Sequence, residues 1–105
     1  MSASSTFTED GFLRCPQSWS SDLAQEVATT LEIELTDEHW QVIRGVRSFY
    51  MRTGKSLSMR PLIRVVRNEV DANLGSSLQL ARLFGHRTSR NVAMISGLPK
   101  PSDCI

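Results

Sequence analysis

The stretch TDEHWQVIRGVRSFYMRTG, residues 36–54, carries the clearest helix signals of the chain. Thr36 is a favoured N-cap residue, and Asp37 and Glu38 place negative charge at the positive end of the helix dipole. Gly54 is of the residue type that most often ends helices. Between these ends the apolar residues recur with helical spacing, at Val42, Ile43, Val46, Phe49 and Tyr50. The stretch therefore predicts a helix whose wide apolar face is central to the core.

Four further helices are predicted on the two sides of this stretch. Most have a serine that can cap the start, and each carries apolar residues at helical spacing. Their expected positions are residues 21–31, 59–70, 78–84 and 91–96. Two of the helices meet near Gly54. The predicted fold class is therefore mostly α, a small helical bundle with a helix-turn-helix-like core.

The two ends of the chain are predicted to be non-helical. Residues 1–6, rich in serine and threonine, are expected to be a disordered tail. Thr6–Glu9 and Phe12–Cys15 flank the dipeptide Asp10-Gly11, which suits a tight turn, so a short N-terminal β-hairpin is expected. Residues 97–105 contain two prolines, which disfavour helix in the residues before them. This segment is predicted to be an extended, flexible C-terminal arm.

The length and composition indicate one globular domain, residues 1–105. With 40% apolar and 22% charged residues, the 105-residue chain resembles an ordinary soluble domain. Its two cysteines cannot form the disulfide framework of a small secreted fold. No apolar run approaches the length of about 20 residues that a membrane-spanning helix needs, and the first residues lack the features of a signal peptide. A cytoplasmic location is therefore expected.

The charges are divided unequally along the chain. Residues 1–40 hold eight acidic residues and one basic residue, a net charge of −7, whereas residues 41–105 hold eleven basic and three acidic residues, a net charge of +8. A bipolar protein of this kind could present its basic side to an acidic protein or to a nucleic acid. Alternatively, the two halves pack together and partly neutralise each other. The sequence leaves both interpretations open.

The motifs predict no bound cofactor or metal. There is no glycine-rich phosphate-binding loop, and paired metal-ligand spacing is not formed by His39, His86, Cys15 and Cys104. His39 is expected at the surface or at the edge of the core. Cys15 is expected to be a small packing residue. Trp19 is expected to pack the hairpin onto the first helix.

Cys104 is the residue most suited to chemistry. It is next to last in the sequence and follows two prolines, so a place in the core is not expected. An exposed thiol on such an arm can reach into another protein and carry a transferable group as a thiolate or a persulfide. The neighbouring carboxylate of Asp103 disfavours the thiolate, so activation would come from the partner. The alternative is an inert thiol.

The final run GLPKPSDCI, residues 97–105, resembles the C-terminal signature of the DsrC/TusE family. Three other parts of the chain agree with the family in order and spacing: residues 10–13 with Trp19-Ser20, residues 38–43 with 47–50, and Leu83-Phe84. The resemblance covers nearly the whole chain from about residue 8. It implies a small, mostly helical fold and a sulfur carrier that accepts a persulfide sulfur on Cys104.

The resemblance also implies the mode of carriage. DsrC-like members have a second cysteine ten residues before the penultimate one, and Met94 occupies that position here. A disulfide within the arm is therefore not expected, and the single-cysteine, TusE-like mode fits better. Such a protein acts as a co-substrate of other proteins rather than as a stand-alone enzyme.

The partners that the resemblance implies are a donor complex of the TusBCD or DsrEFH type and a sulfur acceptor. The acceptor would be the thiouridylase that makes 2-thiouridine in tRNA, or a sulfite-reductase-like enzyme. Lys100, Arg87 and Arg90 are expected to serve in partner docking. No membrane is expected as a partner, and direct contact with nucleic acid is disfavoured.

Two other functions fit parts of the sequence. A DNA-binding helix-turn-helix regulator would use the basic residues Arg60, Arg64 and Arg67, although the acidic first 40 residues would repel phosphate. A second alternative is an accessory subunit that docks on a sulfite reductase without carrying sulfur. In that case Cys104 would be dispensable.

Overall fold

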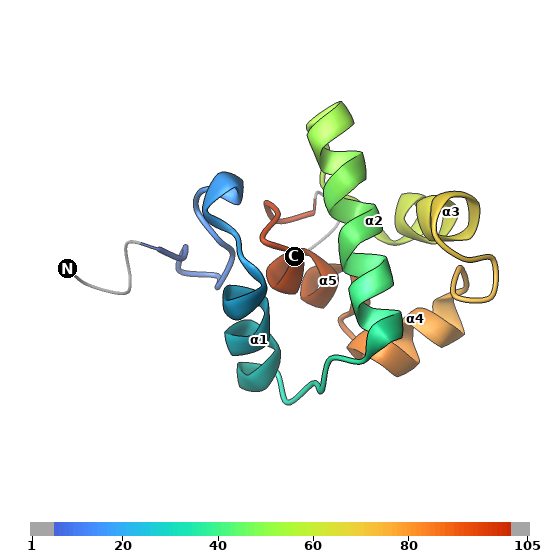
Figure 1. The fold of residues 1–105 in the computed structure, drawn as a ribbon, viewed down its shortest axis with the longest axis horizontal. Coiled ribbons are helices and arrows are strands. Elements are labelled where there is room, and N and C mark those ends of the chain that lie inside the picture. The colour runs from blue at the N-terminus through green and yellow to red at the C-terminus, as the bar shows by residue number, and fades with distance from the viewer. Residues whose placement is uncertain (1–5, 102–105) are drawn as a thin grey trace.

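The computed structural model describes residues 6–101 as a bundle of five α-helices (Figure 1). The mostly helical fold class is therefore confirmed. None of the helices in this range is both long and apolar enough to span a bilayer. The helices are α1 (Ser21–Thr30), α2 (Asp37–Thr53), α3 (Met59–Glu69), α4 (Ser77–Phe84) and α5 (Thr88–Ser96), preceded by a single 3-10 turn, η2 (Pro16–Ser18).

The last helix, α5, is the centre of the bundle. It packs against each of the other four helices, and α1 packs against no other helix of the described chain (Figure 1). Val92, Ala93 and Ile95 are buried at 3%, 2% and 0% exposure, as expected for a helix surrounded by others. Burial of α5 on several sides therefore makes its apolar residues part of the hydrophobic core that all five helices share.

Helix starts and ends follow the predicted residues in most cases. The Ser20 hydroxyl accepts a hydrogen bond from the Leu23 N–H at 3.2 Å, and Ser76 does the same for Gln79 at 3.1 Å. Gly54 ends α2 with a φ of 73°, in the left-handed region that favours glycine.

The start of α5 differs from the prediction. It begins at Thr88, three residues before the predicted Asn91. Its first turn is polar, so apolar periodicity gives no signal there. The turn is fixed instead by side chains that satisfy the end of α4, where the Asn91 amide donates to the Phe84 carbonyl at 2.7 Å and the Thr88 hydroxyl donates to the Gly85 carbonyl at 2.6 Å.

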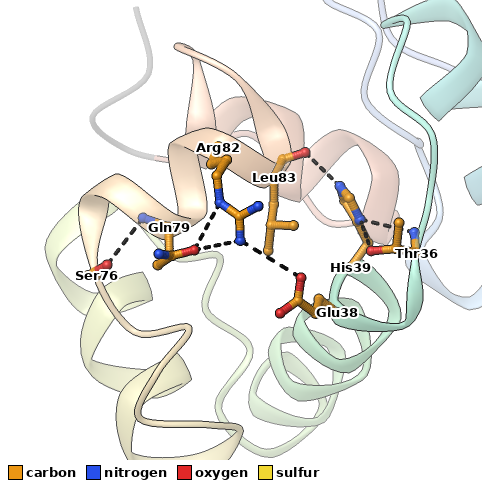
Figure 2. A network of polar contacts seen from close by, with 7 residues as sticks. All are labelled: Thr36, Glu38, His39, Ser76, Gln79, Arg82 and Leu83. Atoms are coloured by element: carbon orange, nitrogen blue, oxygen red, sulfur yellow. Dashed lines mark hydrogen bonds and ion pairs between the residues drawn. The ribbon is translucent and has the colours of Figure 1, made fainter.

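The expectation for His39 is wrong: the side chain is buried, with 5% of its surface exposed. The Thr36 N–H donates to Nδ1 at 3.0 Å, and Nε2 lies 2.6 Å from the Leu83 carbonyl oxygen (Figure 2). Because a backbone N–H can only donate and a carbonyl can only accept, these contacts assign the acceptor role to Nδ1 and the donor role to Nε2. The ring edge also packs on Phe84, with centroids 4.9 Å apart. His39 thus joins the start of α2 to the end of α4.

The predicted N-terminal hairpin is also wrong. Within residues 6–101 the only pairing of this kind is one isolated antiparallel bridge between Phe7 and Leu13. A two-residue hairpin turn of the Asp-Gly type needs positive φ at both residues; Gly11 has a φ of 95°, but Asp10 does not have a positive φ. The turn instead closes with the Gly11 N–H donating to the Thr8 carbonyl at 3.0 Å.

The chain leaves this bridge soon after Leu13. Pro16, which has no N–H to donate, begins η2 soon after Leu13. Of the predicted N-terminal tail, residues 1–5 lie outside the described residues. Thr6 is part of the folded segment, since its carbonyl accepts a hydrogen bond from the Arg14 N–H at 3.0 Å.

Replacing His39 by alanine should destabilise the protein strongly. The change removes a buried ring and leaves the Thr36 N–H and the Leu83 carbonyl without their partner, which should cost about 2–4 kcal/mol. Urea denaturation followed by circular dichroism measures this cost. The matched control is His86→Ala at an exposed position, where a change of about 0.5 kcal/mol or less is expected. Equal unfolding midpoints for the two variants would contradict the role assigned to His39.

Candidate functional site

Cys104, the predicted sulfur-carrying residue, lies outside the described residues. The segment that leads to it is described as far as Pro101. This segment leaves α5 at Gly97 through a helix-ending motif in which the Leu98 N–H donates to the Ala93 carbonyl at 2.9 Å. Residues 98–101 are non-helical, as predicted. They differ from the predicted flexible arm because Leu98 is 2% exposed and Pro101 is less than 2% exposed. In the arm base, residues 97–101, Leu98 and Pro101 are therefore packed into the domain, whereas Pro99 and Lys100 are exposed.

The first contact that holds the arm base is made by Trp19. Its indole N–H donates to the Ile95 carbonyl at 2.8 Å. Gly97 lies directly against the ring: a Cβ at this position would come within 2.4 Å of Trp19 Cδ1. Gly97 also has a φ of 70°. The expected packing of Trp19 against a hairpin is wrong, because the residues before it form a single bridge and its polar atom binds the end of α5.

The second contact comes from Arg47 on α2. Its guanidinium lies 4.3 Å from the centroid of the Trp19 ring and donates to the Ser96 carbonyl at 2.8 Å and to the Pro16 carbonyl at 3.4 Å. Burial lowers the pKa of Arg47 from its ordinary value. Positive charge at this point also complements the negative end of the α5 dipole. Arg47 and Trp19 together fix the last turn of α5 from two sides.

Two of the predicted docking residues meet outside this contact, at Asp10. Lys100 Nζ lies 3.4 Å from the Asp10 carboxylate, and the Arg90 guanidinium donates to the Asp10 backbone carbonyl at 3.1 Å. On the other side of the arm, the Ser56 hydroxyl donates to the Pro99 carbonyl at 2.6 Å. Lys100 therefore contacts the domain at Asp10. As both partners of its ion pair are exposed, the pair contributes little to stability by itself.

The third predicted docking residue, Arg87, lies away from Asp10. It lines an open cavity of about 580 Å³ between the start of α3, α4 and the start of α5, and Arg90 lines the same cavity. The structure thus brings Arg87 and Arg90 together at the cavity and Arg90 and Lys100 together at Asp10. Arg90 is the residue common to both.

Cys15, the other cysteine, and Met94, at the position of the second arm cysteine of DsrC-like members, both lie within residues 6–101. Cys15 is exposed, with its sulfur 3.1 Å from the Gln17 side-chain oxygen, so the expectation of a packing residue is wrong. Met94 is 8% exposed and touches the turn at Gly11, where a Cβ would come within 2.9 Å of its terminal methyl group. Among residues 6–101, no three His, Cys, Asp or Glu side chains form a group that could hold a metal ion.

Arg47, Asp10 and Ser56 are site residues that the sequence analysis did not select. The sequence pattern does indicate that Arg47 lies near the core, since it follows Ile43 by one helical turn and so borders the apolar face of α2. The sequence indicates Asp10 as a turn residue and as part of the family resemblance, but not as a contact of the arm. Nothing in the sequence pattern distinguishes Ser56 from other loop serines.

The described residues form a small helical domain that buries Leu98 and Pro101, and the sequence has a cysteine three residues after this proline. Comparison with known proteins gives the family. The family model described as "DsrC like protein" matches residues 2–105. The chain belongs to the DsrC-like family, and the resemblance drawn from its sequence is confirmed.

The individual relatives agree with this assignment. "Sulfurtransferase TusE homolog" of Haemophilus influenzae is 37% identical over 97 residues, covering 92% of this chain and 89% of the relative. "Sulfurtransferase TusE" of Escherichia coli is 38% identical over 96 residues, covering 91% of this chain and 88% of the relative.

Solved structures of the family share the fold. The NMR structure of Allochromatium vinosum DsrC matches with a TM-score of 0.84 and 29% identity, covering 94% of this chain and 88% of that one. The oxidized gamma-subunit of the dissimilatory sulfite reductase (DsrC) from Archaeoglobus fulgidus matches with a TM-score of 0.77 and 31% identity, covering 94% and 90%.

Replacing Gly97 by alanine should displace the arm base. The variant combines the strain of a left-handed residue with a clash against Trp19, so a loss of about 3 kcal/mol or more is expected. Gly54→Ala is the matched control, because Gly54 has a similar φ of 73° and no atom within 4 Å of the added methyl group. That control should cost only about 1–2 kcal/mol. Thermal unfolding gives the costs, and the NMR signal of the Trp19 indole N–H should shift only in Gly97→Ala. Similar costs and unchanged indole signals in both variants would contradict the proposed contact.

Proposed function

We propose that this protein carries sulfane sulfur as a persulfide on Cys104 and delivers it to another protein. The observation that carries the proposal is the run LPKPSDCI, residues 98–105, in a chain that belongs to the DsrC-like family. The relatives named sulfurtransferase TusE and the DsrC structures support this sulfur-relay role. The packed arm base supports it further, because it fixes the point from which the cysteine is presented.

The transfer is a thiol exchange. The Cys104 thiolate attacks the outer sulfur of a persulfide, R–S–SH, on the donor. A bond forms between the Cys104 sulfur and this outer sulfur, the donor S–S bond breaks, and the donor leaves as the thiolate R–S⁻. The sulfane sulfur keeps its oxidation state, so no external oxidant or reductant is needed. The same exchange with an acceptor thiolate returns Cys104 to its starting state.

The arm base limits where this exchange can take place. Pro101 is buried, and Cys104 follows it by three residues. Covalent geometry limits the span of three residues to at most about 11 Å. A partner must therefore bind on the side of the domain where the arm base ends. The contacts of Trp19 and Arg47 keep that point fixed relative to the helices.

Single-cysteine carriage is the proposed mode. Met94 occupies the position of the second arm cysteine of DsrC-like members and is buried among apolar residues. A disulfide between two arm cysteines is therefore not part of the proposed mechanism.

The proposed donor is a complex of the TusBCD or DsrEFH type. The proposed acceptor is a thiouridylase acting on tRNA, with a sulfite-reductase-like enzyme as the alternative acceptor. A cytoplasmic location remains a prediction.

The two alternative functions are not favoured. A DNA-binding helix would need Arg60, Arg64 and Arg67 free on α3, but Arg67 donates two hydrogen bonds to the Gly75 carbonyl, at 3.1 and 2.9 Å. These bonds hold the loop between α3 and α4.

The accessory-subunit alternative gains no support from the relatives named sulfurtransferase. The match to the structure titled dissimilatory sulfite reductase I, at 21% identity, shows the fold alone.

The proposed function is tested by mass spectrometry after incubation with glutathione persulfide. An added mass of about 32 Da, one sulfur atom, should map to Cys104. It should disappear in Cys104→Ser and persist in the control Cys15→Ser, which removes the exposed thiol on the folded domain. The sulfur should then move to a second thiol protein supplied as acceptor. Sulfur on Cys15 alone, or none on Cys104, would refute sulfur carriage by this residue.

A further inference from the structure

The cavity lined by Arg87 and Arg90 combines basic and apolar side chains. Its other basic lining residue is His86, and none of its lining residues is acidic. Its apolar lining includes Leu78 on α4, which at 74% is the more exposed of the two large hydrophobic side chains exposed in residues 6–101. We refer to the residues used here as the basic groove: Met59, Leu78, Ala81, His86, Arg87 and Arg90.

The start of α5 adds to the positive potential of the basic groove. Thr88 and Ser89, in the first turn of this nine-residue helix, line the cavity. The N-cap position, Arg87, makes no capping hydrogen bond through its side chain, and the first turn carries no acidic residue. The helix dipole therefore adds partial positive charge to that of the arginines. Both sources of charge favour a carboxylate.

A second cavity has a different character. It is lined by Glu32 and Glu34. Its one arginine, Arg82, is already occupied, because it donates to the Gln79 side chain at 3.0 and 2.7 Å and lies 3.9 Å from Glu38 (Figure 2). An acidic partner would be repelled from this second cavity and attracted to the basic groove. The two cavities therefore distinguish partners by charge.

The basic groove lies beside the arm base. Arg90 lines the groove and also binds Asp10, the residue that pairs with Lys100 of the arm. Met59 lines the groove three residues after Ser56, whose hydroxyl binds Pro99. The groove is thus connected to the arm base through Asp10, which both Arg90 and Lys100 contact.

We propose that the basic groove docks an acidic segment of the protein that exchanges sulfur with this one, with an apolar side chain of that segment against Leu78. This inference rests on the proposed function for the identity of the partner, although the docking itself does not require sulfur chemistry. The exposed leucine and Ala81 favour a peptide over a nucleic acid, since phosphate contacts alone would make no use of an apolar surface. Docking here would bring the partner to the side from which Cys104 is presented.

The experiment measures docking directly by fluorescence anisotropy. The probe is a short fluorescein-labelled peptide of glutamate, leucine and glycine, titrated with the full chain at low ionic strength. The variants are Leu78→Asp and Arg87→Glu, both at exposed positions and neither in the contacts that hold the arm base. Each should weaken binding roughly tenfold or more, because each removes an attraction and adds a repelling charge. Binding should also weaken as salt is raised.

Matched controls carry the same changes elsewhere. Met51→Asp changes the other exposed large hydrophobic residue, on α2, and Arg64→Glu changes an exposed arginine on α3. Both should bind the probe within about twofold of the unchanged chain, as expected for residues outside the interface. A peptide with lysine in place of glutamate should not bind the groove.

Three results would overturn the proposal. One is the absence of saturable binding up to about 1 mM protein. Another is an equal loss of binding in the groove variants and in the controls. The third is tighter binding of a single-stranded RNA oligonucleotide than of the acidic peptide through the same residues. Cys104→Ser should bind the probe normally, so failure of docking and failure of sulfur carriage give different results.

Discussion

The hydrogen bond from the Trp19 indole to the Ile95 carbonyl, with the Arg47 guanidinium over the same ring, is the contact on which the arrangement of the chain end depends. It joins three parts of the sequence: the segment before α1, the middle of α2 and the last turn of α5. Gly97 is required at the point of closest approach. Because α5 also contacts every other helix, the position of the arm base is set by the whole core rather than by a local loop.

The unequal charges of the two halves have two separate structural outcomes. Some acidic residues of the first half neutralise basic residues of the second, as Asp10 does for Lys100 and Glu38 for Arg82. Other charges gather at separate cavities, with Glu32 and Glu34 at one beside Arg82, and Arg87 and Arg90 at another. Within residues 6–101, neutralisation between the two halves is therefore limited to a few contacts, and a basic docking side stays a prediction.

Residues with strong local preferences made the helices predictable. Ser20, Ser76 and Gly54 act at helix ends through bonds or φ angles that involve only neighbouring residues. The features that could not be predicted depend on contacts between distant residues. The burial of His39 requires the carbonyl of Leu83, 44 residues away, and the packing of residues 98–101 requires Ser56 and Asp10. The hairpin prediction failed because Asp10 lacks the positive φ that the turn needs.

The burial of Pro101 has a consequence for how strongly partners need to bind. Only two residues separate this buried proline from Cys104, so under the proposed function the thiol acts within the span of three residues, at most about 11 Å. Confinement by a short tether gives a reactive group an effective concentration on the order of millimolar or higher towards any site within its span. A partner that associates weakly and briefly therefore meets a concentrated thiol. Fast release after each transfer, which a relay between successive proteins requires, is then compatible with efficient exchange.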